Sequence, residues 1–327
     1  MNLPPTNPAA RIDADTLRNF VGTVFERTGA PAEYATFLAD MLVANDLRGV
    51  FSHGTRQVAG YSRQFRDGQL NPDPQVRVVM ETPTSVTVDG DGSLGYLPAY
   101  RAATMLCEKA LAMGVAVGLT RNHGHIGAAG IYSRIPLQHD LFCYVTSGHQ
   151  LNLQPGQPIL SAAGGSPMSF AIPAGEEPPF VLDFGAMHDL YIHSQHTQEI
   201  IQKAPGLVFR CIGLGSVCQA LGGFLAGVPV DPARAERKWP GANQGSFMIV
   251  VDLNLFLPIE QFKQEMDEYY RKVRQLTPLP GFDRAMLAGG PEYEREREYT
   301  AEGIPLSEQH VATLRQVARD FGLSAPV

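Results

Sequence analysis

Two histidines stand close together in segment 121–130, which reads Arg-Asn-His-Gly-His-Ile-Gly-Ala-Ala-Gly and follows an expected strand. The segment opens an expected helix, whose unpaired N–H groups and partial positive charge favour bound anions and lower the pKa of a nearby imidazole. A neutral His125 there could exchange a proton with a substrate hydroxyl. Two other interpretations stay open: a close-packed turn without chemistry, and a metal site that uses His123 and His125, for which no further ligands can be placed.

A second candidate segment, 46–56, reads Asp-Leu-Arg-Gly-Val-Phe-Ser-His-Gly-Thr-Arg and lies between two expected helices. Arg48 and Arg56 are suited to binding a carboxylate through two parallel hydrogen bonds, and His53 can donate a third. The alternative is structural: both arginines then lie on the surface, and His53 caps a helix.

The composition limits the choice of ligand. The chain has 327 residues, of which 44% are hydrophobic, so it can bury a large core. Its 26 basic and 33 acidic residues give a net charge of -7, which supplies no electrostatic reason to expect nucleic acid or an anionic membrane as partner. We therefore expect a small-molecule carboxylate substrate.

The cysteines and the apolar segments suggest a location. The four cysteines are far apart or lie in apolar stretches, form no C-x-x-C pair, and are interpreted as reduced core thiols: Cys107, Cys143, Cys211 and Cys218. The N-terminal residues lack a secretory signal pattern, and no segment approaches about 18 uninterrupted apolar residues. These features predict a cytoplasmic protein without a membrane span.

Hydrophobic periodicity divides the chain into three parts: a helical unit over 1–75, a mixed α/β domain over 76–258, and a helical segment over 259–327. We expect helices at 13–25, 31–45, 53–65, 99–113, 128–137, 214–226, 259–276 and 307–321. We expect a hairpin around Pro83 and strands at 115–120, 141–147, 168–172, 180–183 and 245–253. The charge run 291–303 is typical of a solvated helix or loop.

The two candidate segments and the chain around them resemble the malate/L-lactate dehydrogenase family, which also holds ureidoglycolate and sulfolactate dehydrogenases and piperideine-carboxylate reductases. The matching stretches cover nearly the whole chain. They are D-x-R-G-x-x-S-H-G-x-x-R, with the arginine here at Arg56, then N-x-x-H-x-G-A-A-G, the helix 214–227, and Glu-Gly-Ile-Pro-Leu at 302–306.

The resemblance implies an α/β fold without a Rossmann domain, in which an N-terminal helical unit joins a mixed α/β domain. It also implies a homodimer in which both subunits help to build the pocket. The implied reaction is hydride transfer between NAD(P)H and a 2-oxo or cyclic imino acid, with His125 as general acid/base. By this resemblance the catalytic residues are His125, His53 and Arg48, and the residues expected at the substrate are Arg56, His123, Arg121 and Tyr191.

The cofactor half of the family pattern is altered in this chain. Gly165-Ser166-Pro167 stands where the family usually has Thr-Asn-Pro, and Asp183 is followed by Phe-Gly-Ala-Met instead of a Met-Ala-Thr-Ser-like run. Arg210 replaces the lysine of Lys-Gly-Tyr-Gly-Leu. We expect Gly165, Ser166, Pro167, Asp183 and Arg210 at a bound NAD or NADP. No G-x-G-x-x-G that follows a strand replaces the lost groups.

Three hypotheses follow from these residues. The first is a divergent NAD(P)-dependent oxidoreductase for a small 2-hydroxy, 2-oxo or imino acid. The alternative is a lyase, isomerase, cyclase or hydrolase that uses the same histidine and arginine pocket without any cofactor. The third, a non-catalytic binding protein, is the least favoured. Segment 188–196, with His188, His193 and His196, is either a polar surface helix or a rebuilt pocket wall that could add metal ligands.

Overall fold

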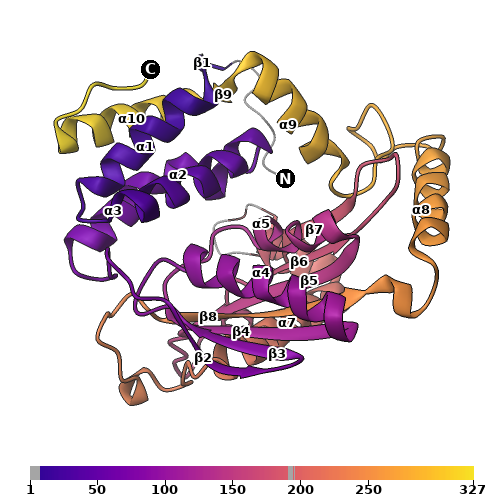
Figure 1. Ribbon diagram of the computed structural model, residues 1–327, viewed down its shortest axis with the longest axis horizontal. Coiled ribbons are helices and arrows are strands. Elements are labelled where there is room, and N and C mark those ends of the chain that lie inside the picture. Colours follow the sequence, from indigo (N-terminus) through magenta and orange to yellow (C-terminus); the bar gives the residue numbers. More distant parts are fainter. Residues whose placement is uncertain (1–7, 191–193, 195) are drawn as a thin grey trace.

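The computed structural model of the protein describes residues 8–190, 194 and 196–327, and every element named below lies within them. They form a mixed seven-stranded sheet in the order β2-β3-β4-β8-β5-β6-β7 and a separate two-stranded sheet, β1-β9 (Figure 1). The strands are β1 (Ala10–Ile12), β2 (Arg77–Thr82), β3 (Ser85–Asp89), β4 (Val115–His123), β5 (Leu141–His149), β6 (Pro167–Ile172), β7 (Phe180–Gly185), β8 (Gln244–Asp252) and β9 (Ile304–Leu306).

Helices lie on both faces of the large sheet and in a separate layer above one edge (Figure 1). The helices are α1 (Ala14–Glu26), α2 (Ala32–Leu47), α3 (Val58–Arg66), α4 (Tyr96–Met113), α5 (Gly130–Ser133), α6 (Thr197–Lys203), α7 (Pro205–Cys218), α8 (Ile259–Val273), α9 (Gly290–Glu302) and α10 (Glu308–Phe321). This arrangement confirms the predicted mixed α/β class.

The pairing in the large sheet is mostly antiparallel, and only β3 and β4 run parallel. In the centre, β5 pairs with β8 along nine positions, from Leu141 opposite Asp252 to His149 opposite Gln244. A Rossmann domain is instead built on a mostly parallel sheet. The expectation of a fold outside the Rossmann class is therefore confirmed.

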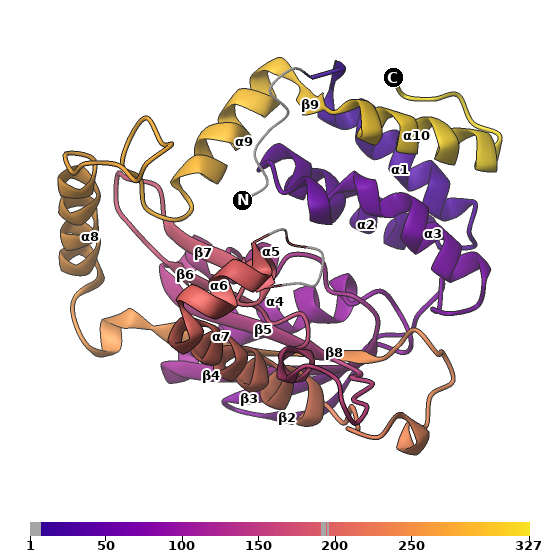
Figure 2. The same ribbon diagram turned by 180° about the vertical axis from the view of Figure 1, so that it is seen from behind.

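The two faces of the sheet are covered by different helices. Helix α4 packs on β3, β4 and β8. On the other side, α7 packs on β5 and β6, and the π-helix that follows it, Gln219–Phe224, packs on β5 and β8 (Figure 2). The π-helix approaches very closely, because a Cβ built on Gly222 would lie 2.5 Å from the backbone nitrogen of Gly148. Only glycine permits this contact between helix and strand.

The N-terminal helices share their layer with α9 and α10, and β1 pairs antiparallel with β9 between them (Figure 1). Helix α1 begins as predicted at Asp13, whose carboxylate accepts a hydrogen bond from the backbone N–H of Thr16 at 2.9 Å. Its apolar stripe, which includes Leu17, Val21 and Val24, is fully buried.

Three expected helices differ from the structure. The helix expected at 53–65 begins as two 3₁₀ turns, Phe51–His53 and Thr55–Gln57, and becomes α-helical only at Val58. The helix expected at 128–137 is a single turn, α5, followed by a 3₁₀ turn that starts at Pro136, because proline cannot donate to the preceding turn. The helix expected at 214–226 begins already at Pro205, a favourable first helical residue.

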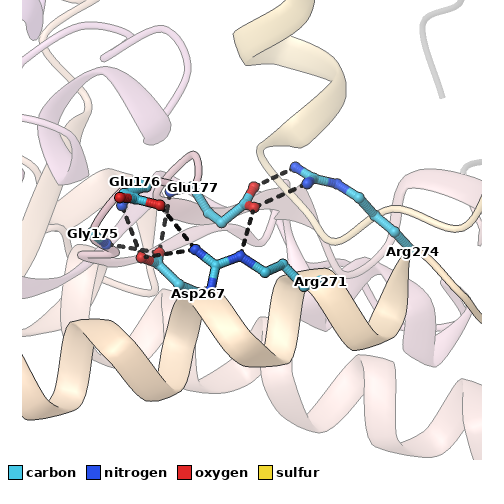
Figure 3. A network of polar contacts seen from close by, with 6 residues as sticks. All are labelled: Gly175, Glu176, Glu177, Asp267, Arg271 and Arg274. Atoms are coloured by element: carbon cyan, nitrogen blue, oxygen red, sulfur yellow. Dashed lines mark hydrogen bonds and ion pairs between the residues drawn. The ribbon is translucent and has the colours of Figure 1, made fainter.

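Helix α8 projects at the edge of the molecule and is attached to the β6–β7 turn by a polar network (Figure 3). The carboxylate of Asp267 accepts hydrogen bonds from the backbone N–H groups of Gly175 (2.9 Å), Glu176 (2.9 Å) and Glu177 (3.1 Å). Burial alone would raise the pKa of Asp267, but these donors and Arg271 hold it below its ordinary value. The ionised carboxylate therefore fixes the turn to the helix.

One stretch, Pro205–Phe224, is long and apolar enough to meet the length and composition criteria for a membrane-crossing helix. Apolar helices of soluble proteins meet the same criteria. About one third of this stretch is buried inside the protein, on the side that packs against β5.

We predict that Asp267→Ala releases the β6–β7 turn from α8, because three backbone N–H groups lose a charged acceptor. The free energy of unfolding should fall by about 2 kcal/mol, and the amides of Gly175–Glu177 should lose protection in hydrogen exchange. Glu268→Ala, which removes an exposed ion pair with Lys272 on the same helix, should leave both unchanged. Equal protection of these amides in both variants would contradict the role of Asp267.

Candidate active site

A buried carboxylate fixes the turn between α2 and α3. Asp46 accepts hydrogen bonds from the N–H (3.0 Å) and the hydroxyl (2.5 Å) of Thr55, and this hydroxyl also contacts Nε2 of His310 on α10 at 2.9 Å. A Cβ built on Gly54 would lie 1.8 Å from Oδ1 of Asp46, so no larger residue fits there. The carboxylate therefore dictates the sharp turn that ends the first 3₁₀ turn at His53.

His53 lies at the end of that 3₁₀ turn and faces His125, with 5.5 Å between the ring centroids. Its Nδ1 lies 2.9 Å from the hydroxyl of Ser52, and its backbone carbonyl accepts a hydrogen bond from the side chain of Asn45 at 2.8 Å. Ser52 belongs to the candidate segment, and Asn45 immediately precedes it. The structure thus brings together the two histidines that the sequence singles out.

A tyrosine of α3 forms a hydrogen bond with the ring of His125. The hydroxyl of Tyr61 lies 2.7 Å from Nδ1 of His125 and 3.4 Å from the hydroxyl of Tyr96. Because a hydroxyl both donates and accepts, Tyr61 can stabilise either neutral tautomer of the imidazole and also the imidazolium. Nε2 is the ring nitrogen that Tyr61 leaves available.

Burial keeps these imidazoles neutral. It lowers the pKa of His125 to about 3, and the nearby rings of His53, His149 and His123 act in the same direction. Burial also lowers the pKa of His53, with His188 as a second cause. At neutral pH, His125 is therefore a proton acceptor, and protonating it requires a compensating negative charge nearby.

His149, at the end of β5, is a third histidine near this point that the sequence does not single out. The side chain of Gln219, the first residue of the π-helix, accepts from its backbone N–H at 3.2 Å and donates to its carbonyl. Burial lowers the pKa of His149. The expected strand ended at position 147 and no motif surrounds this residue, so only the pairing of β5 with β8 places it beside His125.

A cavity of about 1480 Å³ opens beside these histidines, between the N-terminal helical layer, β7, α7 and the chain that precedes α9. Its lining includes His53 and the backbone of 127–129, but not His125 itself, whose ring contacts His53. This volume exceeds that of typical small-molecule sites and is sufficient for a substrate together with a dinucleotide.

Asp183 and Arg134 face this cavity next to each other. The backbone N–H of Gly130 donates to Oδ2 of Asp183 at 3.0 Å, and the guanidinium of Arg134 donates to the carbonyl of Gly130 at 3.1 Å. Burial raises the pKa of Asp183 to about 6 and lowers that of Arg134 to about 10, so both are mainly charged at pH 7. Asp183 was expected at the cofactor, whereas Arg134 was not expected in the site.

The turn 165–167 also reaches the cavity, with Gly165 and Pro167 in its wall. Ser166 is buried with a left-handed backbone (φ 46°), and its hydroxyl accepts a hydrogen bond from the N–H of Met187 at 3.1 Å. This hydroxyl therefore joins the turn to the end of β7. A ligand in the cavity would therefore contact Gly165 and the ring of Pro167, and not the hydroxyl of Ser166.

The expected carboxylate-binding arginines are engaged elsewhere. Arg48 forms a two-pronged ion pair with Glu296 of α9, at 2.8 and 3.2 Å. Arg56 is exposed and donates to Gln309 of α10 at 3.2 Å, while the next residue, Gln57, lines the cavity. Consecutive residues of a 3₁₀ turn point in different directions, and here the arginine is the residue that points outward.

The remaining expected substrate and cofactor residues lie in different places. Arg121 pairs with Asp89 on β3 at 3.1 Å, and Arg210 is exposed on α7 and does not line the cavity. His123 is fully buried, and both its ring nitrogens are used: Nδ1 donates to the carbonyl of Gly124 and Nε2 contacts the hydroxyl of Thr120, each at 2.7 Å. In this arrangement His123 has no ring nitrogen left for a substrate.

Tyr191 and His193, which the sequence singles out in the 188–196 segment, lie outside the described residues. Of the other two histidines there, His188 lines the cavity and His196 precedes α6. Within the described part of the chain, no group of three histidine, cysteine, aspartate or glutamate side chains is arranged to hold a metal ion.

Comparison with known proteins gives the family. The model of the malate/L-lactate dehydrogenase family matches residues 12–187 and 205–315, most of the chain. The protein belongs to the malate/L-lactate dehydrogenase family. Both the His53 and the His125 segments lie within the matched ranges.

Relatives of this dehydrogenase family member are distant but span almost the full chain. Malate dehydrogenase of Pyrococcus horikoshii is 25% identical, covering 96% of each chain, and its solved structure superimposes with a TM-score of 0.83 over 99% of this chain and 98% of that one. L-sulfolactate dehydrogenase of Methanocaldococcus jannaschii is 25% identical, covering 92% of this chain and 94% of its own. NAD(+) ureidoglycolate dehydrogenase of Escherichia coli K12 is 22% identical, covering 90% and 92%.

We predict that Asp46→Asn makes the stability of this family member less sensitive to pH. Burial raises the pKa of Asp46 from 3.8 to about 7, so between these two values the native carboxyl is mainly protonated while the unfolded one is mainly ionised. Stability from this group is thus present at low pH and is lost as pH rises toward 7. Relative to wild type, Asp46→Asn should gain stability between pH 5 and pH 8 in urea titrations. A constant difference across this range would contradict a raised pKa.

Proposed function

We propose that the protein is an NAD(P)-dependent oxidoreductase that acts on a small 2-hydroxy, 2-oxo or cyclic imino acid, with His125 as general acid/base. The observation that carries the proposal is the neutral imidazole of His125, which is hydrogen-bonded to Tyr61 and faces His53, a residue that lines a large cavity. Membership of the family and the names of its relatives, malate, sulfolactate and ureidoglycolate dehydrogenases, support the same reaction class.

The cavity suits a nicotinamide dinucleotide by its size and by its wall. A Cβ built on Gly165 would meet nothing closer than 3.9 Å, so there is space beside its Cα for an atom of the ligand. The accessible surface of Asp183 opens into the cavity and offers a carboxylate to ribose hydroxyls. We propose that Gly165, Pro167 and Asp183 hold NAD or NADP, which when bound supplies or removes the hydride.

The proton step is assigned to His125 in this proposal. In oxidation, Nε2 takes the proton of the substrate hydroxyl, and Tyr61 stabilises the imidazolium by accepting from Nδ1. In reduction, the imidazolium returns that proton. Because burial keeps the free imidazole neutral, the substrate carboxylate must raise the pKa of His125 when it binds, and His53 can donate to this carboxylate.

The first test is binding followed by turnover. NADH or NADPH should raise the melting temperature of the pure protein, because a ligand that binds only the native state stabilises it. A panel of malate, sulfolactate, ureidoglycolate and piperideine-2-carboxylate, followed by nicotinamide absorbance, should then identify a substrate. No shift with any nicotinamide dinucleotide and no absorbance change with any substrate would refute the proposal. Turnover of a panel member without nicotinamide would refute it as well.

The second test concerns the histidine and its tyrosine. His125→Asn should reduce kcat by about 10²- to 10⁴-fold, the usual contribution of a general acid/base. Tyr61→Phe should lower kcat about 10-fold and shift the pH profile, because the imidazolium loses its acceptor. Tyr269→Phe, an exposed tyrosine of α8, is the matched control and should behave like wild type. An unchanged pH profile in Tyr61→Phe would exclude its part in the proton step.

We also propose that the protein is a homodimer, as the family resemblance implies. The outward face of α7 is apolar and exposed, and two of its residues, Leu207 and Leu214, also line the cavity. A second copy seated on this face would cover apolar surface and close one side of the site.

Sedimentation velocity tests the dimer. Phe209→Glu, at a residue of α7 that is 76% exposed, should convert the dimer to monomer because it places a charge in the apolar contact. Phe256→Glu changes an equally exposed phenylalanine, 77% exposed, away from α7 and should leave the dimer intact. A wild-type protein that sediments as a monomer would refute the proposal.

A further inference from the structure

Arg134 is a cation of the cavity wall without an ion-pair partner among the described residues. It follows α5, nine residues after His125, and its side chain lines the cavity. Within the described part of the chain its guanidinium donates to the carbonyl of Gly130 at 3.1 Å, which leaves most of its N–H donors available. Among the residues that the structure describes, no carboxylate lies within ion-pair distance of the guanidinium.

Two other cations of the same cavity wall are neutralised. Lys203 pairs with Glu199 at 2.6 Å, and Arg284 pairs with Glu294. Arg295 lines the wall from α9, with the stem of its side chain against the backbone of Gly49. Arg134 differs from all three by its place beside Gly130 and Asp183, at the start of the chain segment that follows the His125 motif.

Leaving this guanidinium without a charged partner is costly. Burial disfavours its charged form, and Arg48 opposes it as well. The carboxylates of Asp183, Glu292 and Glu296 favour its charged form from a distance, but none is close enough to pair, and Asp183 accepts a hydrogen bond from the N–H of Gly130. A ligand oxyanion that completes the donors of Arg134 would repay this cost, since a guanidinium fork matches carboxylate and phosphate oxygens.

We propose that Arg134 is the oxyanion anchor of the cavity and binds a carboxylate or phosphate group of the ligand. Asp183, beside it, accepts a hydrogen bond from a hydroxyl of the same ligand. A 2-hydroxy acid and a ribosyl phosphate both carry a hydroxyl near an oxyanion, so substrate and dinucleotide are the two sources of this chemistry. The inference deepens the proposed function and rests on it for the identity of the ligand.

Calorimetric titration of three variants tests the anchor, with malonate as the carboxylate probe and ADP-ribose as the phosphate probe. Arg134→Met removes the charge with little change in length, Arg134→Lys keeps the charge without the fork, and Arg284→Met removes a paired cation from the same wall. Arg134→Met should weaken one of the probes by about 10- to 100-fold, the range expected for charge-assisted hydrogen bonds. Arg134→Lys should recover part of this loss, and Arg284→Met should bind as wild type does.

The probe that loses affinity identifies the source: malonate indicates the substrate carboxylate, and ADP-ribose indicates the dinucleotide phosphate. Unchanged affinity for both probes in Arg134→Met, or the same loss in Arg284→Met, overturns the inference. Circular dichroism establishes that each variant is folded, and Arg134→Lys alone decides the test if Arg134→Met is not.

Experiments can distinguish a failure of the Arg134 anchor from a failure of the proposed oxidoreductase function. Nicotinamide-dependent turnover with unchanged KM for both substrates in Arg134→Met leaves the proposed function standing and removes the anchor. Weaker malonate or ADP-ribose binding in Arg134→Met, in a protein that transfers no hydride to any panel substrate, supports the anchor and removes the proposed function.

Discussion

The hydrogen bonds of Asp46 to Thr55 determine where His53 stands. They span the turn between two helices and continue through the Thr55 hydroxyl to His310, so one buried carboxylate joins the N-terminal helices to α10. Its second oxygen, Oδ1, is buried without a hydrogen-bond partner in the described structure. A buried carboxylate with an unpartnered oxygen lowers the stability of the fold near neutral pH. It lies at the turn that positions His53 beside His125.

Much of the fold could be predicted from the sequence where local signals agree with the tertiary structure. Asp13 and Ser307 cap the helices that their positions suggest, and the alternating β-branched residues around Pro83 form the expected hairpin. The prediction was wrong where a distant contact decides the backbone. The turn at Gly54 exists because of Asp46, a contact that helical periodicity does not reveal.

The candidate site shows the same limit. Sequence motifs identify His53 and His125 as candidates. Tyr61 and His149 belong to elements that carry no motif, and only tertiary packing places them near His125. Residue type also does not reveal direction. Arg56 points to α10 while Gln57 faces the cavity, so a one-residue difference in a 3₁₀ turn changes which chemistry is presented to a ligand.

The small sheet formed by β1 and β9 has a consequence for how the protein is made. Ala10 pairs with Leu306, so the strand before α1 finds its partner only after almost the whole chain has been synthesised. Until then the apolar stripe of α1 lacks the C-terminal helices that help to cover it. The surface of the helical layer that α10 and β9 cover therefore stays exposed during translation, after α1 and α2 have already met, and it is a target for a chaperone.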